Sequence, residues 1–203
     1  MQTAGTGLYR GSDFGVDDRG YGSFVANSRT DRAAKHSNHL MVAKFDELLK
    51  SQGAVAIRNN SVFATSYLPR ARSFGRPSYV FPIDGKSHYT FLKQVQDIVL
   101  RDNLSFMVRD FYMLKMLQKI DPSIEEVADD HWGREDQANK VMAAMDQDPR
   151  MVKAWAHTLG LHVDQGLELA LKAGSEVYIS GFYFSVDMWR YTRLLDRLGI
   201  VRD

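Results

Sequence analysis

The chain has 203 residues, 44% of them hydrophobic and 25% charged, which is typical of a globular protein and predicts a single domain over residues 1–203. Its 26 Lys and Arg residues balance 25 Asp and Glu residues, and the net charge of +1 argues against a general nucleic-acid coat or a polybasic membrane anchor. The lack of cysteine excludes disulfides, a cysteine nucleophile and cysteine-rich zinc sites. No stretch approaches the roughly 18 apolar residues of a membrane-spanning helix. We therefore expect no membrane partner, and a location in the cytoplasm or in a virion.

The first part of the chain, residues 1–88, is predicted to be rich in strands. Residues 1–26 contain many glycines, which favour turns and short strands over helix. One helix with a single buried stripe is predicted from Thr30, its N-cap, to Gly53. The remaining runs of β-branched and aromatic residues predict strands at 9–11, 23–26, 61–66 and 78–83, with at most a helical turn over 71–74.

The middle of the chain, residues 89–172, is predicted to be helical and to contain no strand. Pro122, Pro149 and Gly160 interrupt apolar residues that recur at helical spacing. The predicted helices cover 89–101, 104–119, 123–130, 134–147, 149–159 and 164–172. Whether this region covers the sheet or forms a separate lobe is left open by the periodicity.

The last part of the chain returns to strand and ends in a helix. Residues 175–187 alternate and are aromatic, which predicts two short strands hinged at Gly181 in the strand-rich segment 173–187. An amphipathic helix follows over 188–199. We interpret the aromatic residues here as core side chains that fill one face of the sheet: Phe182, Tyr183, Phe184 and Trp189. Strands at both ends with helices between them predict an α+β fold.

No metal site is predicted. His36 and His39 lie three residues apart on one helix, but no third ligand stands at a zinc-site spacing. The group Asp129-Asp130-His131 with Glu135 resembles a ligand set in composition, yet Asp at a helix start caps backbone N–H groups without any ion.

One ordered set of motifs carries more information than these isolated groups. An aromatic-Arg-Gly strand comes first, in Tyr9-Arg10-Gly11. A strand ending in Ala64-Thr65-Ser66 follows, with an Ala-x-x-Phe-Gly turn at 71–75. A late strand opens with an acid and contains a glycine, in Glu176-Val-Tyr-Ile-Ser-Gly181. This order resembles the arginine-serine-glutamate class of ADP-ribosyltransferases, in particular the divergent members found in bacteriophages.

The resemblance implies a split β core built from the N-terminal and C-terminal strands, which binds NAD as substrate in a cleft and uses no metal. Arg10 and the adjacent Gly11 would contact a phosphate of NAD, Thr65 and Ser66 would buttress the site, and Glu176 would be the catalytic acid. The implied activity is cleavage of nicotinamide from NAD and transfer of ADP-ribose to a macromolecular acceptor such as a protein. A guanidinium fork suits pyrophosphate, and a carboxylate beside a developing cationic sugar stabilises that charge.

Two positions depart from the family pattern and keep other functions open. Ala64 stands where the family has its first serine, and Gly174 stands where arginine-modifying members carry an acid. Both favour the alternative of a non-enzymatic structural or assembly protein, such as a virion component, that keeps a degenerate transferase-like scaffold. A third interpretation is a module whose acidic helices over 121–148 dock a basic partner. None of the three requires a specific nucleic-acid partner.

Overall fold

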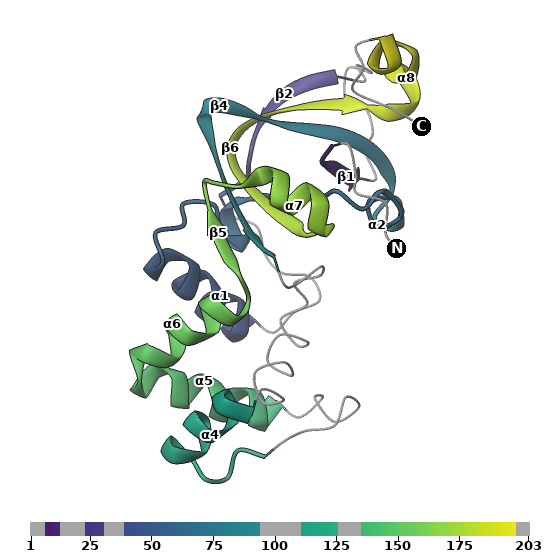
Figure 1. The fold of residues 1–203 in the computed structure, drawn as a ribbon. Helices are drawn as coiled ribbons and strands as arrows, with labels where there is room; N and C mark the ends of the chain where they lie inside the picture. Colours follow the sequence, from purple (N-terminus) through teal and green to yellow (C-terminus); the bar gives the residue numbers. More distant parts are fainter. Residues whose placement is uncertain (1–6, 13–22, 31–38, 94–110, 126–134, 198–203) are drawn as a thin grey trace.

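The protein is an α+β structure in which one curled sheet is joined to a group of helices (Figure 1). A computed structural model describes residues 7–12, 23–30, 39–93, 111–125 and 135–197. The strands are β1 (Tyr9–Ser12), β2 (Ser23–Asn27), β3 (Val62–Thr65), β4 (Arg76–Leu92), β5 (Leu161–Val163) and β6 (Glu176–Asp187). The helices are α1 (His39–Ser51), the 3-10 turn η1 (Arg58–Asn60), α2 (Leu68–Ser73), α4 (Phe111–Ile120), α5 (Glu135–Gln147), α6 (Pro149–Thr158), α7 (Leu167–Ala173) and α8 (Met188–Arg197).

Two long bent strands, β4 and β6, organise the sheet. They pair with each other antiparallel along most of their length, and the strand order is β2-β6-β3-β1-β4-β5. The first half of β6 also pairs with β3 and its second half with β2, while β4 pairs with β1 near its start and with β5 at its end. Gly181 has φ +84 at the bend of β6, where an added Cβ would lie 2.3 Å from the Lys86 carbonyl oxygen. Only glycine fits this bend without strain.

The two faces of this curled sheet carry different helices. On the face we call the α7 face, Leu8, Ala64 and Val177 pack with Ala170 of α7. On the opposite face, which we call the α2 face, Tyr9 and Tyr79 pack with Ala71 of α2. Successive strand residues alternate between faces, so the cross-strand register assigns each side chain to one of them.

The helices α1, α4, α5 and α6 share a core of their own, and Figure 1 shows them below the sheet. Phe45, Leu117 and Trp155 are fully or almost fully buried in this core. Tyr178 of β6 belongs to the same cluster, and its ring lies 6.5 Å from that of Phe45 and 5.0 Å from that of Phe63. The helical region is therefore a lobe whose core is continuous with the sheet.

Several expected boundaries are wrong. Tyr89 to Leu92 form the end of β4 and not the start of a helix, because Tyr89 and Phe91 pair with Ile179 and Val177. The strand β5 lies inside the region expected to be only helical, and residues 123–125 are not helical. The expected turn at Asp84-Gly85 is an irregularity within β4, and the two expected C-terminal strands are one bent strand. The expected helical segments 30–38, 94–110 and 126–134 lie wholly or almost wholly outside the described residues.

Candidate functional site

The strands that carry the predicted site residues are neighbours in the sheet. Tyr9 of β1 lies opposite Thr65 of β3, and Thr65 lies opposite Glu176 of β6. Tyr9 begins its strand, Thr65 ends its strand and Glu176 begins its strand. The three motifs therefore meet at one end of three adjacent strands, although Glu176 is more than a hundred residues from the other two in sequence.

Arg10 lies on the α7 face, since it follows Tyr9 by one residue. Its Nη1 donates a hydrogen bond to the Tyr183 hydroxyl at 2.9 Å. Ala64 and Val177 are opposite each other in the register and continue the same row. Both belong to the apolar cluster beneath α7. On the other side of β1, the residue opposite Arg10 is the buried Ser78 of β4, so Arg10 has both apolar and polar neighbours on this face.

Ser66 and Thr65 hold the connection between α7 and β6. The Ser66 hydroxyl donates to the backbone carbonyls of Leu171, at 2.7 Å, and Ala170, at 3.3 Å. The Thr65 hydroxyl donates to the Gly174 carbonyl at 3.3 Å and accepts from the Tyr67 N–H at 3.1 Å. These bonds hold the end of α7 and the residue Gly174 in place, and so they position the start of β6 at Glu176.

Glu176 lies on the α2 face and is buried, with 9% of its surface exposed. Its charge acts on the hydroxyl of Tyr178, the next residue on the same face. Burial raises the pKa of Tyr178 well above its usual value, and the Glu176 charge raises it further, while the nearby Arg58 guanidinium lowers it. Arg58 also lies over the Phe63 ring, at 5.5 Å from the ring centroid. Glu176 thus belongs to a buried polar environment where the sheet joins the helical lobe.

Asp46 of α1 supplies the other carboxylate of this environment. Its two oxygens accept the backbone N–H groups of Arg58, at 2.7 Å, and Asn59, at 3.1 Å. Burial raises the pKa of Asp46, and these two N–H groups oppose the rise. The sequence analysis did not find Asp46, and it assigned Tyr183 only to the core, because neither residue stands in a recognisable motif that would reveal its polar contact.

Gly11 has a structural reason to be glycine. A Cβ at this position would lie 1.9 Å from the Ala71 carbonyl oxygen and 2.9 Å from Phe74 atoms. The close approach lets α2 pack directly on β1. Of the predicted site residues, the structure brings Thr65 and Glu176 into direct register and places Arg10 on the other face of the same strand ends.

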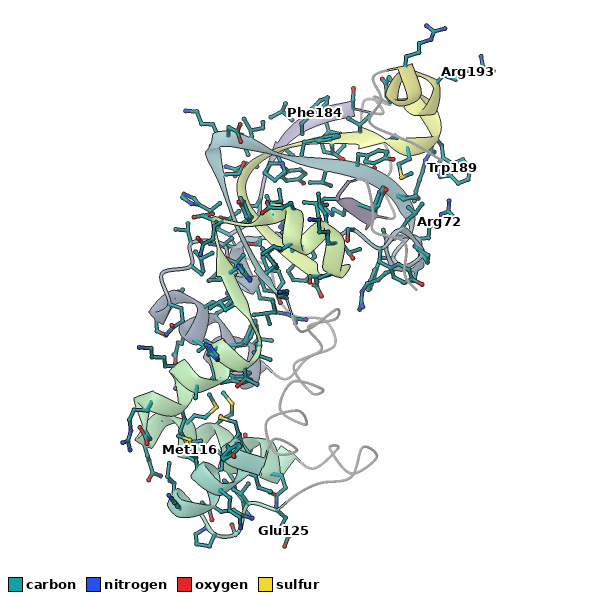
Figure 2. The ribbon with its side chains drawn as sticks, viewed as in Figure 1. Arg72, Met116, Glu125, Phe184, Trp189 and Arg193 are labelled. Carbon is teal, nitrogen blue, oxygen red and sulfur yellow. The ribbon has the colours of Figure 1, made fainter. Side chains whose placement is uncertain are left out.

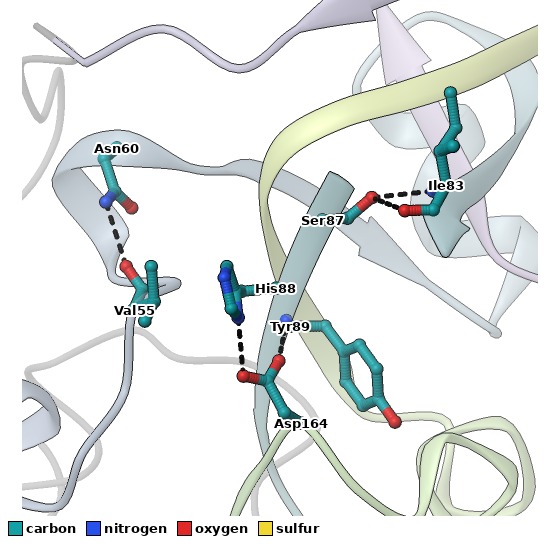
Figure 3. A network of polar contacts seen from close by, with 7 residues as sticks. All are labelled: Val55, Asn60, Ile83, Ser87, His88, Tyr89 and Asp164. Atoms are coloured by element: carbon teal, nitrogen blue, oxygen red, sulfur yellow. Dashed lines mark hydrogen bonds and ion pairs between the residues drawn. The ribbon is translucent and has the colours of Figure 1, made fainter. Parts of the chain in front are cut away.

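A second polar network lies where the loop after β5 meets β4 (Figure 3). Asp164, in the left-handed region at φ +49, accepts the Tyr89 N–H at 2.7 Å and lies 2.7 Å from Nδ1 of His88. On the same strand the Ser87 hydroxyl accepts the Ile83 N–H at 2.6 Å and donates to the Ile83 carbonyl at 2.9 Å. Each contact fastens a loop or a strand irregularity, which is a structural role.

Neither a metal site nor a membrane span is found in the part of the chain that the structure describes. No three His, Asp or Glu residues there are grouped as metal ligands. His36 and Asp129-Asp130-His131 lie outside the described residues. Among the described helices, none combines the length and apolar character needed to cross a bilayer. Comparison of the chain with protein-family models, curated proteins and solved structures gives no match.

Proposed function

We propose that the protein binds NAD at the ends of β1, β3 and β6 and cleaves nicotinamide from it, as an ADP-ribosyltransferase-like enzyme. One observation carries the proposal. The Arg10, Thr65-Ser66 and Glu176 motifs are related in the sequence only by their order. In the fold they lie on three adjacent strands at one end of the sheet.

The chemistry follows from the residue types. The guanidinium of Arg10 has five N–H donors, of which the bond to Tyr183 uses one, and it would bind a phosphate of NAD. The bond between the ribose C1′ and the nicotinamide nitrogen breaks, and its electron pair leaves with nicotinamide. The Glu176 carboxylate stabilises the positive charge that develops on the ribose. An oxygen or nitrogen of the acceptor, or water, then bonds to C1′ and releases its proton to solvent.

The register limits how NAD would lie. Arg10 and Glu176 project from opposite faces, so a molecule that meets both must cross the row formed by Tyr9, Thr65 and Glu176 at the strand ends. The hydroxyls of Thr65 and Ser66 fix this edge through the α7 backbone. They would buttress the site rather than contact the reacting atoms.

The proposal is tested by measuring nicotinamide release from NAD by the purified protein, alone and with host lysate. Glu176→Gln should lower the rate by orders of magnitude with an unchanged circular dichroism spectrum, because the carboxylate stabilises the transition state. Glu168→Gln, at an exposed position of α7, is the matched control and should keep the wild-type rate. Equal rates in wild type and Glu176→Gln would contradict the assignment of Glu176.

A second candidate is a non-enzymatic assembly protein with the same scaffold. It is favoured by the burial of Glu176, and by the apolar Ala64 and Val177 on the face of the sheet that carries Arg10. In that case calorimetry detects no NAD binding, nicotinamide is not released, and the protein is recovered from cells with a stable protein partner.

A further inference from the structure

Exposed arginine and aromatic side chains lie on α8 and on or directly after α2. Both α2 and α8 pack on the same buried cluster of the α2 face, α2 through Ala71 and Leu68 and α8 through Met188 and Tyr191. Two large aromatic side chains of this region point into solvent, Phe74 at 61% exposed and Trp189 at 66% exposed. The expectation that Phe182, Phe184 and Trp189 fill the core is wrong, because all three are exposed, whereas Tyr183 is buried as expected.

The charge around these aromatic residues is positive. Residues 67–83 contain three arginines and no acid, and α8 contains three arginines and one acid. Arg72 of α2 and Arg193 of α8 are exposed, and Figure 2 shows Arg72 and Trp189 on the same side of the molecule. We call Arg72, Phe74, Trp189 and Arg193 the arginine–aromatic surface. The net charge of +1 hides this local excess.

A buried carboxylate fixes the base of this surface. Asp187, which is almost wholly buried, lies 2.7 Å from the Nε of Arg76, at the start of β4. The same carboxylate accepts the backbone N–H of Arg190 at 3.0 Å, in the first turn of α8. Asp187 thereby connects the strand that follows α2 to the helix that carries Trp189. The helix that carries Trp189 is thereby attached to the sheet by polar contacts.

We propose that the arginine–aromatic surface binds single-stranded nucleic acid without regard to sequence. Unpaired bases stack on exposed aromatic side chains, and neighbouring arginines meet the phosphates. A duplex offers phosphates but keeps its bases stacked, so the aromatic residues favour single strands. The proposal is independent of NAD chemistry, because none of the four residues belongs to the candidate site.

Fluorescence anisotropy with a labelled 20-nucleotide oligo(dT) tests it on the full chain. We expect binding that Trp189→Ala weakens by about tenfold, since one stacked base is lost. Arg72→Ala and Arg193→Ala should each reduce the slope of log K against log salt by about 0.7, the value for one phosphate of a single strand. Tyr112→Ala and Arg150→Ala, two exposed positions of the helical lobe, are the controls and should bind as wild type.

Two further measurements separate stacking from simple charge attraction. Trp189→Phe should retain most of the affinity while it loses the quenching of tryptophan fluorescence that oligo(dT) produces. A 20-base-pair duplex should bind more weakly than oligo(dT), although it carries more charge. No binding of oligo(dT), equal or tighter binding of the duplex or of heparin, or an unchanged affinity of Trp189→Ala would each overturn the proposal.

Discussion

Arg10 and Tyr183 form a hydrogen bond, 2.9 Å from Nη1 to the hydroxyl oxygen, between residues 173 positions apart. Their strands, β1 and β6, are not neighbours in the order of the sheet, because β3 lies between them there. The side-chain bond therefore joins two strands that do not pair directly with each other. It also fixes the orientation of the guanidinium that would meet a phosphate of NAD.

Replacement of Tyr183 by Phe should lower the free energy of unfolding by about 2 kcal/mol, because a hydrogen bond to a charged group is lost in a partly buried place. Urea denaturation measures the change. Tyr112→Phe, at an exposed hydroxyl of α4, should change the stability by less than about 0.5 kcal/mol. If the two variants are equally stable, the bond to Arg10 contributes nothing to folding.

Gly11→Ala should disrupt the packing of α2 on β1, since the new Cβ would lie 1.9 Å from a backbone carbonyl oxygen. We expect a loss of more than about 3 kcal/mol in unfolding free energy, or no folded protein. Gly85→Ala is the control: its φ is +67, but the space around it is open, so it should cost only about 1 to 2 kcal/mol. A wild-type melting temperature for Gly11→Ala would show that α2 does not rest on this glycine.

Ala64→Ser introduces the serine that the transferase pattern has at this position, and it should nevertheless destabilise the protein. The position is buried in the apolar cluster with Val177, so the hydroxyl would lose its water and cost about 2 kcal/mol. The exposed Ala43 of α1 provides the control, where a serine should cost less than about 0.5 kcal/mol. A more stable Ala64→Ser protein would mean that a polar partner reaches this row.

Asp46 should make stability fall with rising pH over a defined interval. Below its ordinary pKa of 3.8 the carboxyl is protonated in both the folded and the unfolded state. Burial raises the pKa in the folded state, so between the two values the folded protein holds the proton more strongly. Unfolding therefore releases protons in this interval. As a result, the free energy of unfolding decreases as pH rises through it.

The Asp46→Asn variant isolates that effect. Its side chain does not ionise, so the stability of wild type relative to the variant should decrease from pH 3 until the folded pKa is passed, and then stay level. Urea denaturation of both proteins over pH 3 to 7 measures the difference. A difference that grows with pH would show that the N–H groups of Arg58 and Asn59 outweigh burial.

The sequence predicts the strands well where composition is distinctive. β1, β2, β3 and β6 begin within one residue of their expected starts, because glycine, aromatic and β-branched residues mark them. The full length of β4 could not be predicted: Asp84-Gly85 has the composition of a turn, and only pairing with β6 on both sides of it keeps the chain extended. Tertiary pairing overrode the local signal there.

For the candidate site, the motifs predict which strands meet but not which way their side chains point. One residue of register separates Arg10 from the row of Thr65 and Glu176, and it reverses the face on which each side chain stands. Register depends on contacts across the whole sheet, which no local motif contains. The exposure of Trp189 could not be predicted either, because only the structure shows that Met188 and Tyr191 provide the side of α8 that packs on the sheet.

The position of β6 in the chain has a consequence for biosynthesis. Residues of β2, β3 and β4 all leave the ribosome before their common partner, the segment 176–187, has been made. Until then, the edges that pair with β6 remain open to contacts with other nascent chains. We therefore expect the sheet to close only after β6, which pairs with three other strands, has been made.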